Sequence, residues 1–182
     1  MRAPEYKQKK NTSAMTRLTR LIAAMLLIVL SSALAAASEV GDALKQIKTI
    51  SGKPDTSAIC YVYLDSASWC GPCRAEMPKI VKEYKKMKKK GIEIILCSAD
   101  KTEKDAKNYV KNFKIKFPVI MGSNAKLPGY QRAGGIPHAT FVDAKGNKLE
   151  SGHGSIIVSK WREVLDRISA DDSEDKADEP EE

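Results

Sequence analysis

The sequence predicts a single α/β domain in which helices flank a central sheet. Three observations predict this class: a short apolar run at 59–64, an amphipathic stretch at 74–90, and a second short apolar run at 92–97. Strands that alternate with helices in this way are typical of α/β proteins. With 182 residues, 42% of them apolar, the chain is long enough to bury one core.

The first half of the domain begins with a helix. Apolar side chains recur at helical spacing over 40–50, and the turn residues SGKPD follow at 51–55. The run ICYVYL at 59–64 predicts a strand that is buried on both faces. The stretch 74–90 has one apolar stripe with lysines mostly off it, which indicates a solvated helix face, and Gly91 is suited to end the helix.

The second half continues the alternation. Thr102 begins a helix, with Asp105 three residues on as in a capping box. Three further strands are expected, at 117–121, 139–142 and 148–150. The apolar residues of 155–168 predict a final helix.

The net charge of +8 is divided between the two ends of the chain. Residues 1–20 carry six Lys and Arg against Glu5, whereas 171–182 carry eight acids against Lys176. Without its first 37 residues the chain has a net charge of only +3, and aromatic and basic residues are not interleaved. These features argue against nucleic-acid binding. Residues 171–182 lack apolar periodicity and predict an acidic, disordered tail.

Residues 1–37 are expected to be a secretory signal peptide. An apolar run at 21–37 follows basic residues and ends in small ones, which favours cleavage after Ala37. An uncleaved N-terminal membrane anchor is the alternative, because the alanines bring the apolar part close to the ~20 residues that span a bilayer. A start at Met15 is also open. The folded domain, 38–170, is therefore expected in the periplasm or otherwise outside the cytoplasm.

The chemistry is predicted to reside in Cys70 and Cys73, a Cys-x-x-Cys motif between a buried strand and a helix. Unpaired N–H groups and the dipole at a helix N-terminus stabilise a thiolate, which is the species that attacks disulfides. Cys70 is the predicted nucleophile, and Cys73 lies one turn on, within reach to resolve a mixed disulfide. Gly71 permits the tight entry, and Pro72 fits the first helical turn.

Two other interpretations of the motif are a static disulfide and half of a zinc site. Zinc needs two further ligands. The chain offers Cys60, Cys97, His138 and His153, which are far apart in sequence and form no second paired motif. We therefore expect neither a metal nor an organic cofactor, and the redox group is the Cys70–Cys73 disulfide itself.

These residues resemble the thioredoxin superfamily. The resemblance covers about residues 57–168 and rests on SWCGPC, on a proline five residues after the second cysteine, and on the tripeptide GIP before a strand. RAEMP and FPVIMG are most similar to the extracytoplasmic TlpA/ResA-like branch. The resemblance implies a thioredoxin fold, with a central mixed β-sheet flanked by helices.

The resemblance also implies roles for single residues. Pro137 matches the family's cis-proline, which leaves the backbone of Ile136 free to bind a substrate strand; the plain alternative is an ordinary trans proline. Trp69 matches a tryptophan that shapes the contact surface, and simple packing is its alternative. With these residues, Gly71 and Pro72 complete the expected substrate surface.

Glu76 matches a glutamate that influences the cysteine thiols in the ResA-like branch. It lies one turn beyond the pair, where it is able to exchange protons with Cys73. A glutamate on the helix surface is the competing interpretation.

The sequence also departs from the family. Thioredoxins place a buried aspartate where this chain has Leu64, and the neighbouring Asp65 is expected on the opposite face of the strand. The segment before Ile59 is short and helical in pattern, so the N-terminal hairpin of the branch is expected to be absent. His138 is interpreted as a surface residue, although a role in tuning the site is open.

Cys60 and Cys97 are expected to be buried free thiols. One begins a strand and the other ends its presumed parallel neighbour, so several residues of ~3.3 Å rise separate them, which is too far for a disulfide.

The combined prediction is an extracytoplasmic thiol-disulfide oxidoreductase that reduces disulfides of protein substrates. The Gly-Pro dipeptide between the cysteines matches the reducing end of the family. Expected partners are protein thiols and disulfides and a membrane electron donor, and the protein is expected to be a monomer. Alternatives are a disulfide oxidase or isomerase, and a non-catalytic binding module with the same fold.

Overall fold

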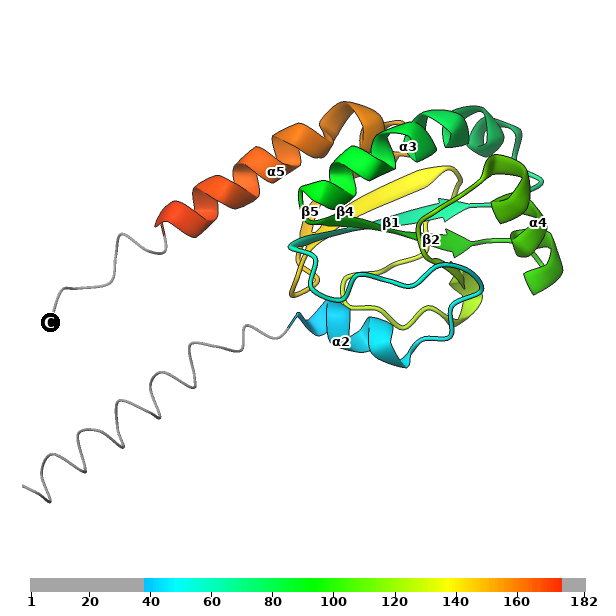
Figure 1. The fold of residues 1–182 in the computed structure, drawn as a ribbon, viewed down its shortest axis with the longest axis horizontal. Coiled ribbons are helices and arrows are strands. Elements are labelled where there is room, and N and C mark those ends of the chain that lie inside the picture. Colours follow the sequence, from blue (N-terminus) through cyan, green and yellow to red (C-terminus); the bar gives the residue numbers. More distant parts are fainter. Residues whose placement is uncertain (1–37, 175–182) are drawn as a thin grey trace, which may run out of the picture. The chain divides into compact units, whose positions relative to one another are not determined.

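The structure is a computed structural model that describes residues 38–174. Its centre is one five-stranded sheet with the order β3-β2-β1-β4-β5 (Figure 1). The strands are β1 (Cys60–Ser66), β2 (Ile92–Ser98), β3 (Val119–Met121), β4 (His138–Asp143) and β5 (Lys148–His153). Strands β1, β2 and β3 are parallel, and β4 is antiparallel to both β1 and β5. The predicted mixed sheet is confirmed.

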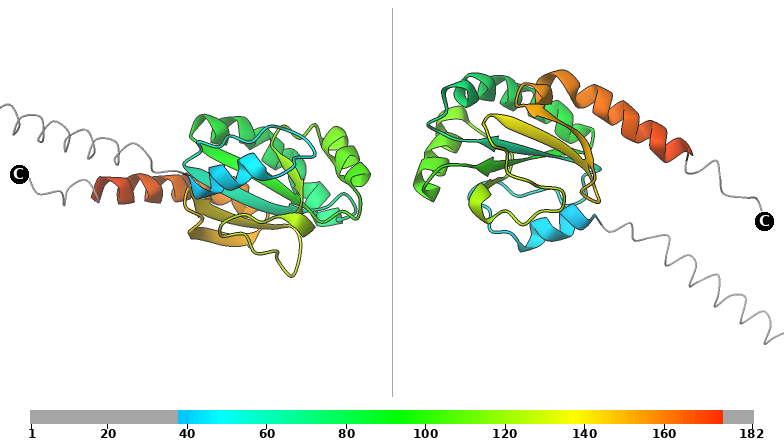
Figure 2. Two further views of the ribbon diagram at one scale, coloured as in Figure 1. Left: turned by 90° about the horizontal axis from the view of Figure 1, so that it is seen from below. Right: turned by 180° about the vertical axis from the view of Figure 1, so that it is seen from behind.

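Helices cover both faces of this sheet. They are α2 (Glu39–Gln46), α3 (Gly71–Lys89), α4 (Glu103–Phe113) and α5 (Ile156–Glu174), with a short 3₁₀ helix, η1 (Gly122–Asn124). Helices α3 and α5 lie on one face and α2 lies on the opposite face (Figures 1 and 2). Helix α4 contacts α3 and the edge strand β3.

The central strand β1 is buried along its whole length. Successive side chains of a strand point to opposite faces. Val62 and Leu64 therefore join the core beneath α3 and α5, whereas Tyr61 and Tyr63 join the core beneath α2. This two-sided burial is the reason why the strand has a continuous apolar and aromatic sequence without polar alternation.

The predicted helix ends of α3 and α4 are confirmed. Thr102 is the N-cap of α4, and its Oγ1 accepts a hydrogen bond from the Asp105 N–H at 3.1 Å. Helix α3 ends before Gly91, whose φ of 77° lies in the left-handed region that glycine adopts without strain.

Two helix ends differ from the prediction. Helix α2 ends at Gln46, before the predicted end at residue 50. No β-hairpin is present between residue 38 and β1, as expected, and one bridge joins Ser51 to Val119. Helix α5 continues to Glu174, so 171–174 are helical and do not belong to a disordered tail. Extension of an existing helix costs far less than nucleation, which allows it to outrun its apolar stripe.

The predicted signal peptide at 1–37 and the remaining tail at 175–182 lie outside the described residues. Within 38–174, no helix is both long enough and apolar enough to cross a membrane.

Candidate active site

The redox pair lies where β1 passes into α3. Cys70 is the N-cap residue of α3, with extended backbone dihedrals, and Pro72 occupies the first turn. Cys70 and Cys73 form a disulfide with an S–S distance of 2.07 Å. The Cys73 N–H points at Cys70 Sγ, at 3.2 Å. The start of the helix thus presents a backbone donor to the sulfur that is predicted to carry the negative charge.

The loop before β4 packs against this disulfide. The Ile136–Pro137 peptide bond is cis, as the family resemblance implied. The Ile136 carbonyl oxygen lies 3.8 Å from Cys70 Sγ, and Ile136 packs on the small apolar cluster that contains both cysteines. Because a disulfide has no proton, Cys70 is able to donate to this carbonyl only in its reduced thiol form.

The surface beside the pair is apolar and open. Trp69 is 65% exposed, although it is a large aromatic residue, and Gly71 and Pro72 are exposed next to it. Simple core packing therefore does not explain Trp69. Together with Ile136 and Pro137, these residues surround the pair as the predicted substrate surface requires, although their roles stay predictions.

Glu76 lies on α3 one turn beyond Cys73. Its side chain is 18% exposed, and its Oε1 lies 3.3 Å from the Lys79 ammonium. No hydrogen bond joins it to either cysteine among the described residues. A role in proton transfer stays a prediction.

Asp65 lies on the face of β1 opposite Leu64, as expected. It is buried, and its two oxygens accept hydrogen bonds from the Tyr130 hydroxyl at 2.7 Å and from the Ala133 N–H at 3.1 Å. This carboxylate therefore holds the loop that leads to cis-Pro137. It does not contact the cysteines through any hydrogen bond of the described chain.

Asp100 is a site residue that sequence reasoning missed. It follows the end of β2, is 5% exposed, and accepts hydrogen bonds from the Ser68 N–H at 3.1 Å, the Ser68 hydroxyl at 2.7 Å and the Ser98 hydroxyl at 2.8 Å. Ser68 lies two residues before Cys70, so Asp100 positions the segment that enters α3. The sequence carries no local signal for this contact, because the pairing of β1 with β2 brings Ser68 and Asp100 together.

The other two cysteines are free and buried, as predicted. Burial raises the pKa of the Cys60 thiol from 9.0 to about 12, and the charge of Asp143 adds to this. Burial also raises the pKa of the Cys97 thiol, with a further contribution from the charge of Asp65. Neither thiol is in a state suited to attack at neutral pH.

His138 is less exposed than the sequence suggested. It begins β4, where it pairs with Asp65 of β1 and His153 of β5, and these neighbours half-bury it. Its Nδ1 is buried and has no hydrogen-bond partner among residues 38–174. In the described part of the chain, no group of three His, Cys, Asp or Glu side chains is arranged to hold a metal ion.

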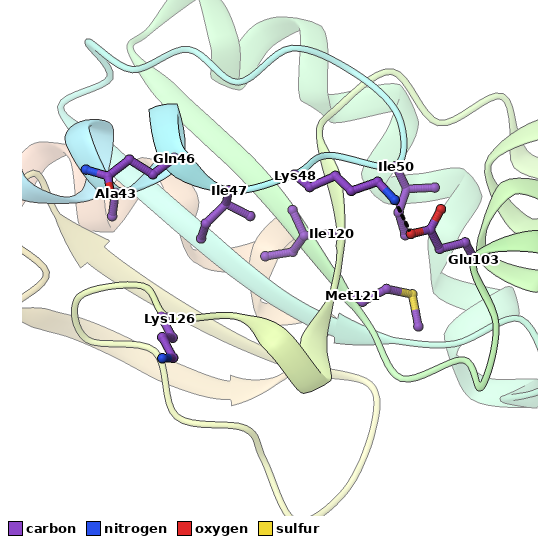
Figure 3. Close-up of a pocket in the computed structure, with 9 residues that line it drawn as sticks. All are labelled: Ala43, Gln46, Ile47, Lys48, Ile50, Glu103, Ile120, Met121 and Lys126. Atoms are coloured by element: carbon purple, nitrogen blue, oxygen red, sulfur yellow. Dashed lines mark hydrogen bonds and ion pairs between the residues drawn. The ribbon is translucent and has the colours of Figure 1, made fainter.

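A hollow of about 550 Å³ between α2 and β3 lies apart from the redox residues (Figure 3). Apolar side chains such as Ile47 and Ile120 line it, and the Lys48–Glu103 ion pair, at 2.7 Å, closes one side. None of the predicted site residues contributes to its wall, so it is not the redox site.

Fold and site together define a thioredoxin-fold domain with a Cys-x-x-Cys disulfide at a helix N-terminus. Residues 45–147 match the AhpC/TSA family, and the chain belongs to this family.

Curated relatives support the ResA-like assignment made from the sequence. The chain is 41% identical over 102 residues to a thiol-disulfide oxidoreductase ResA of Bacillus cereus, a match that covers 56% of this chain and 59% of the relative. It is 30% identical over 140 residues to ResA of Oceanobacillus iheyensis, which covers 71% of this chain and 73% of the relative. The chain thus matches little more than half the length of the first relative.

Solved structures agree with the fold. A thiol:disulfide interchange protein of the thioredoxin family from Chlorobium tepidum TLS superposes with a TM-score of 0.52 at 27% identity, over 66% of this chain and 89% of that one. StoA from Bacillus subtilis has a TM-score of 0.51 at 18% identity, over 59% of this chain and 83% of that chain. The second likeness supports the fold alone.

Asp100→Ala should lower the free energy of unfolding by about 2–4 kcal/mol, because three donors around this buried carboxylate lose their acceptor. Asp100→Asn keeps one oxygen for Ser68 and should lose half of that or less. Urea unfolding of the oxidised proteins measures both. Equal losses in the two variants would contradict the positioning role.

The raised thiol pKa values predict that only Cys70 and Cys73 of the reduced, folded protein react with a thiol-titrating reagent at pH 8. Cys60 and Cys97 should react only after unfolding. A spectroscopic thiol count in native buffer and in guanidinium checks this. Four rapidly reacting thiols in the folded protein would contradict the burial of the second pair.

The same shift predicts a pH dependence of stability. As the pH rises from about 9 towards about 12, the unfolded state ionises at Cys60 while the folded state does not, so stability falls. Cys60→Ala should show a shallower loss than the parent protein over this range, and parallel curves would contradict the assignment.

Proposed function

We propose that this protein is a thiol-disulfide oxidoreductase that reduces disulfides of protein substrates outside the cytoplasm. The observation that carries the proposal is the Cys70–Cys73 disulfide at the first turn of α3, with the Cys73 N–H aimed at Cys70 Sγ. This arrangement favours a thiolate at Cys70 once the pair is reduced.

The reaction consists of two exchanges. The reduced Cys70 thiolate attacks one sulfur of a substrate disulfide, forms a mixed disulfide, and expels the other substrate sulfur as a thiolate. Cys73 then loses its proton and attacks Cys70 Sγ, which releases the second substrate sulfur. Two electrons pass to the substrate, and the Cys70–Cys73 disulfide remains.

The residues around the pair give this exchange its geometry. Contact with a substrate chain is supported by the Ile136 carbonyl next to cis-Pro137, 3.8 Å from Cys70 Sγ, and by the exposure of Trp69. Glu76 is placed one turn beyond Cys73, where a carboxylate is able to take the proton of the resolving thiol. Its Oε1 lies 3.3 Å from the ammonium group of Lys79, the next charged residue along the helix surface.

Reduction and export are the finer parts of the proposal. The Gly-Pro dipeptide supports a low potential, near the ~−270 mV of thioredoxin and far from the ~−120 mV of a strong oxidant. In residues 1–37, basic residues are followed by an apolar run and then by small residues, and this order supports export as a secreted or membrane-anchored protein. A membrane electron donor then restores the thiols.

The reduced protein should accelerate the reduction of insulin disulfides by dithiothreitol, measured as the onset of turbidity. Cys70→Ser should return the rate to the uncatalysed level because no nucleophile remains. Cys73→Ser should accumulate a mixed disulfide with insulin, visible as an added mass, because Cys70 attacks but is not released.

Cys60→Ala is the matched control, since it removes a buried thiol outside the pair and should keep the parent activity. Full activity of Cys70→Ser would contradict the mechanism. A midpoint potential of the Cys70–Cys73 pair near ~−120 mV in glutathione or dithiothreitol buffers would instead favour a disulfide oxidase.

A further inference from the structure

A hollow of about 590 Å³ adjoins the loop that carries cis-Pro137. One wall is the loop 129–135. The other wall is formed by β4 and β5, which contribute His138 and Thr140 from β4 and Lys148 and Ser151 from β5. We call this space the basic hollow.

The charged side chains of the basic hollow are all cations. Arg132 and Lys148 are exposed, and neither makes an ion pair with any described residue. No Asp or Glu is among the lining residues. Thr140 and Ser151, which face each other across β4 and β5, add hydroxyl donors. Such a set suits a carboxylate ligand.

Asp65, which pairs with His138 across the strands, already has hydrogen-bond partners for its carboxylate. Asp65 is 3% exposed, and its oxygens accept hydrogen bonds from Tyr130 and Ala133 on the side of the loop that faces β1. This carboxylate is therefore buried behind the loop, whereas the two cations are exposed. The same hydrogen bonds hold the loop in place, so the wall is preorganised.

The basic hollow is continuous with the redox site along the backbone. Gly134 and Gly135 line it, and a Cβ atom built on either glycine would meet no atom within 4 Å, so this stretch of backbone borders open space. The next residue is Ile136, whose carbonyl oxygen lies 3.8 Å from Cys70 Sγ. An extended substrate chain rises ~3.3 Å per residue. It therefore needs only about two to four residues to pass from the sulfur to the hollow.

We propose that the basic hollow binds acidic side chains of the substrate, and that the protein thereby favours disulfides flanked by Asp or Glu within a few residues. This inference rests on the proposed function and narrows its substrate class. The partner is an extended polypeptide with carboxylates near its cysteine. Arg132 and Lys148 supply the attraction, and the open glycine backbone lets the chain approach.

The test uses the full reduced chain and three synthetic peptides with one internal disulfide. The peptides differ only at two positions flanking one cysteine, which are Asp-Asp, Asn-Asn or Lys-Lys. At low ionic strength the acidic peptide should be reduced about tenfold faster than the neutral one, as two weakly screened ion pairs allow. The ratio should fall towards one at ~0.5 M salt, where screening is strong.

Arg132→Gln with Lys148→Gln should abolish the preference and leave the rate for the Asn-Asn peptide unchanged. Lys89→Gln with Lys116→Gln, which removes the same charge from a separate lysine-rich hollow, should keep the preference. Equal rates for the three peptides, or a preference that survives the first double variant, would overturn the inference while the proposed function stands. Failure to reduce any peptide would overturn both.

Discussion

The structure depends on the direct passage of a buried strand into a helix whose first backbone N–H groups have no carbonyl partner within the helix. Strand β1 is held between two cores and ends at Ser66, so the four residues that follow must bring the chain to α3 at one position. Cys70 therefore becomes the N-cap residue, and its sulfur takes the place that a capping oxygen occupies in other helices. This geometry is the basis of the proposed thiolate at Cys70.

Two buried carboxylates keep the surroundings of that sulfur in place. Asp100 binds Ser68 on the approach to α3, and Asp65 binds the loop that ends in cis-Pro137. Neither forms a hydrogen bond with a cysteine within the described chain. Their common effect is to hold the two segments that meet at Cys70. The helix terminus thus acts on the sulfur directly, whereas the two carboxylates act by holding the segments around it.

The elements near the pair were predictable from the sequence because local signals and burial agree there. Three predicted features each follow from a local sequence signal and are confirmed. They are the strand at 59–64, the helix end before Gly91 and the helix start at Thr102. The role of Asp100 was not predictable, because its partner Ser68 is brought to it only by the pairing of β1 and β2. The half-burial of His138 likewise depends on cross-strand neighbours. Helix α5 extends beyond the last residue of its apolar stripe, so the apolar spacing alone does not indicate where this helix ends.

The most direct test of the account is the order in which thiols of the reduced protein are alkylated at pH 6, read by mass spectrometry after a short pulse of iodoacetamide. The account predicts that Cys70 is labelled first, and faster than in the same chain unfolded in guanidinium, because the start of α3 stabilises its thiolate. Labelling of Cys73 before Cys70, or a Cys70 rate no higher than in the unfolded chain, would contradict it.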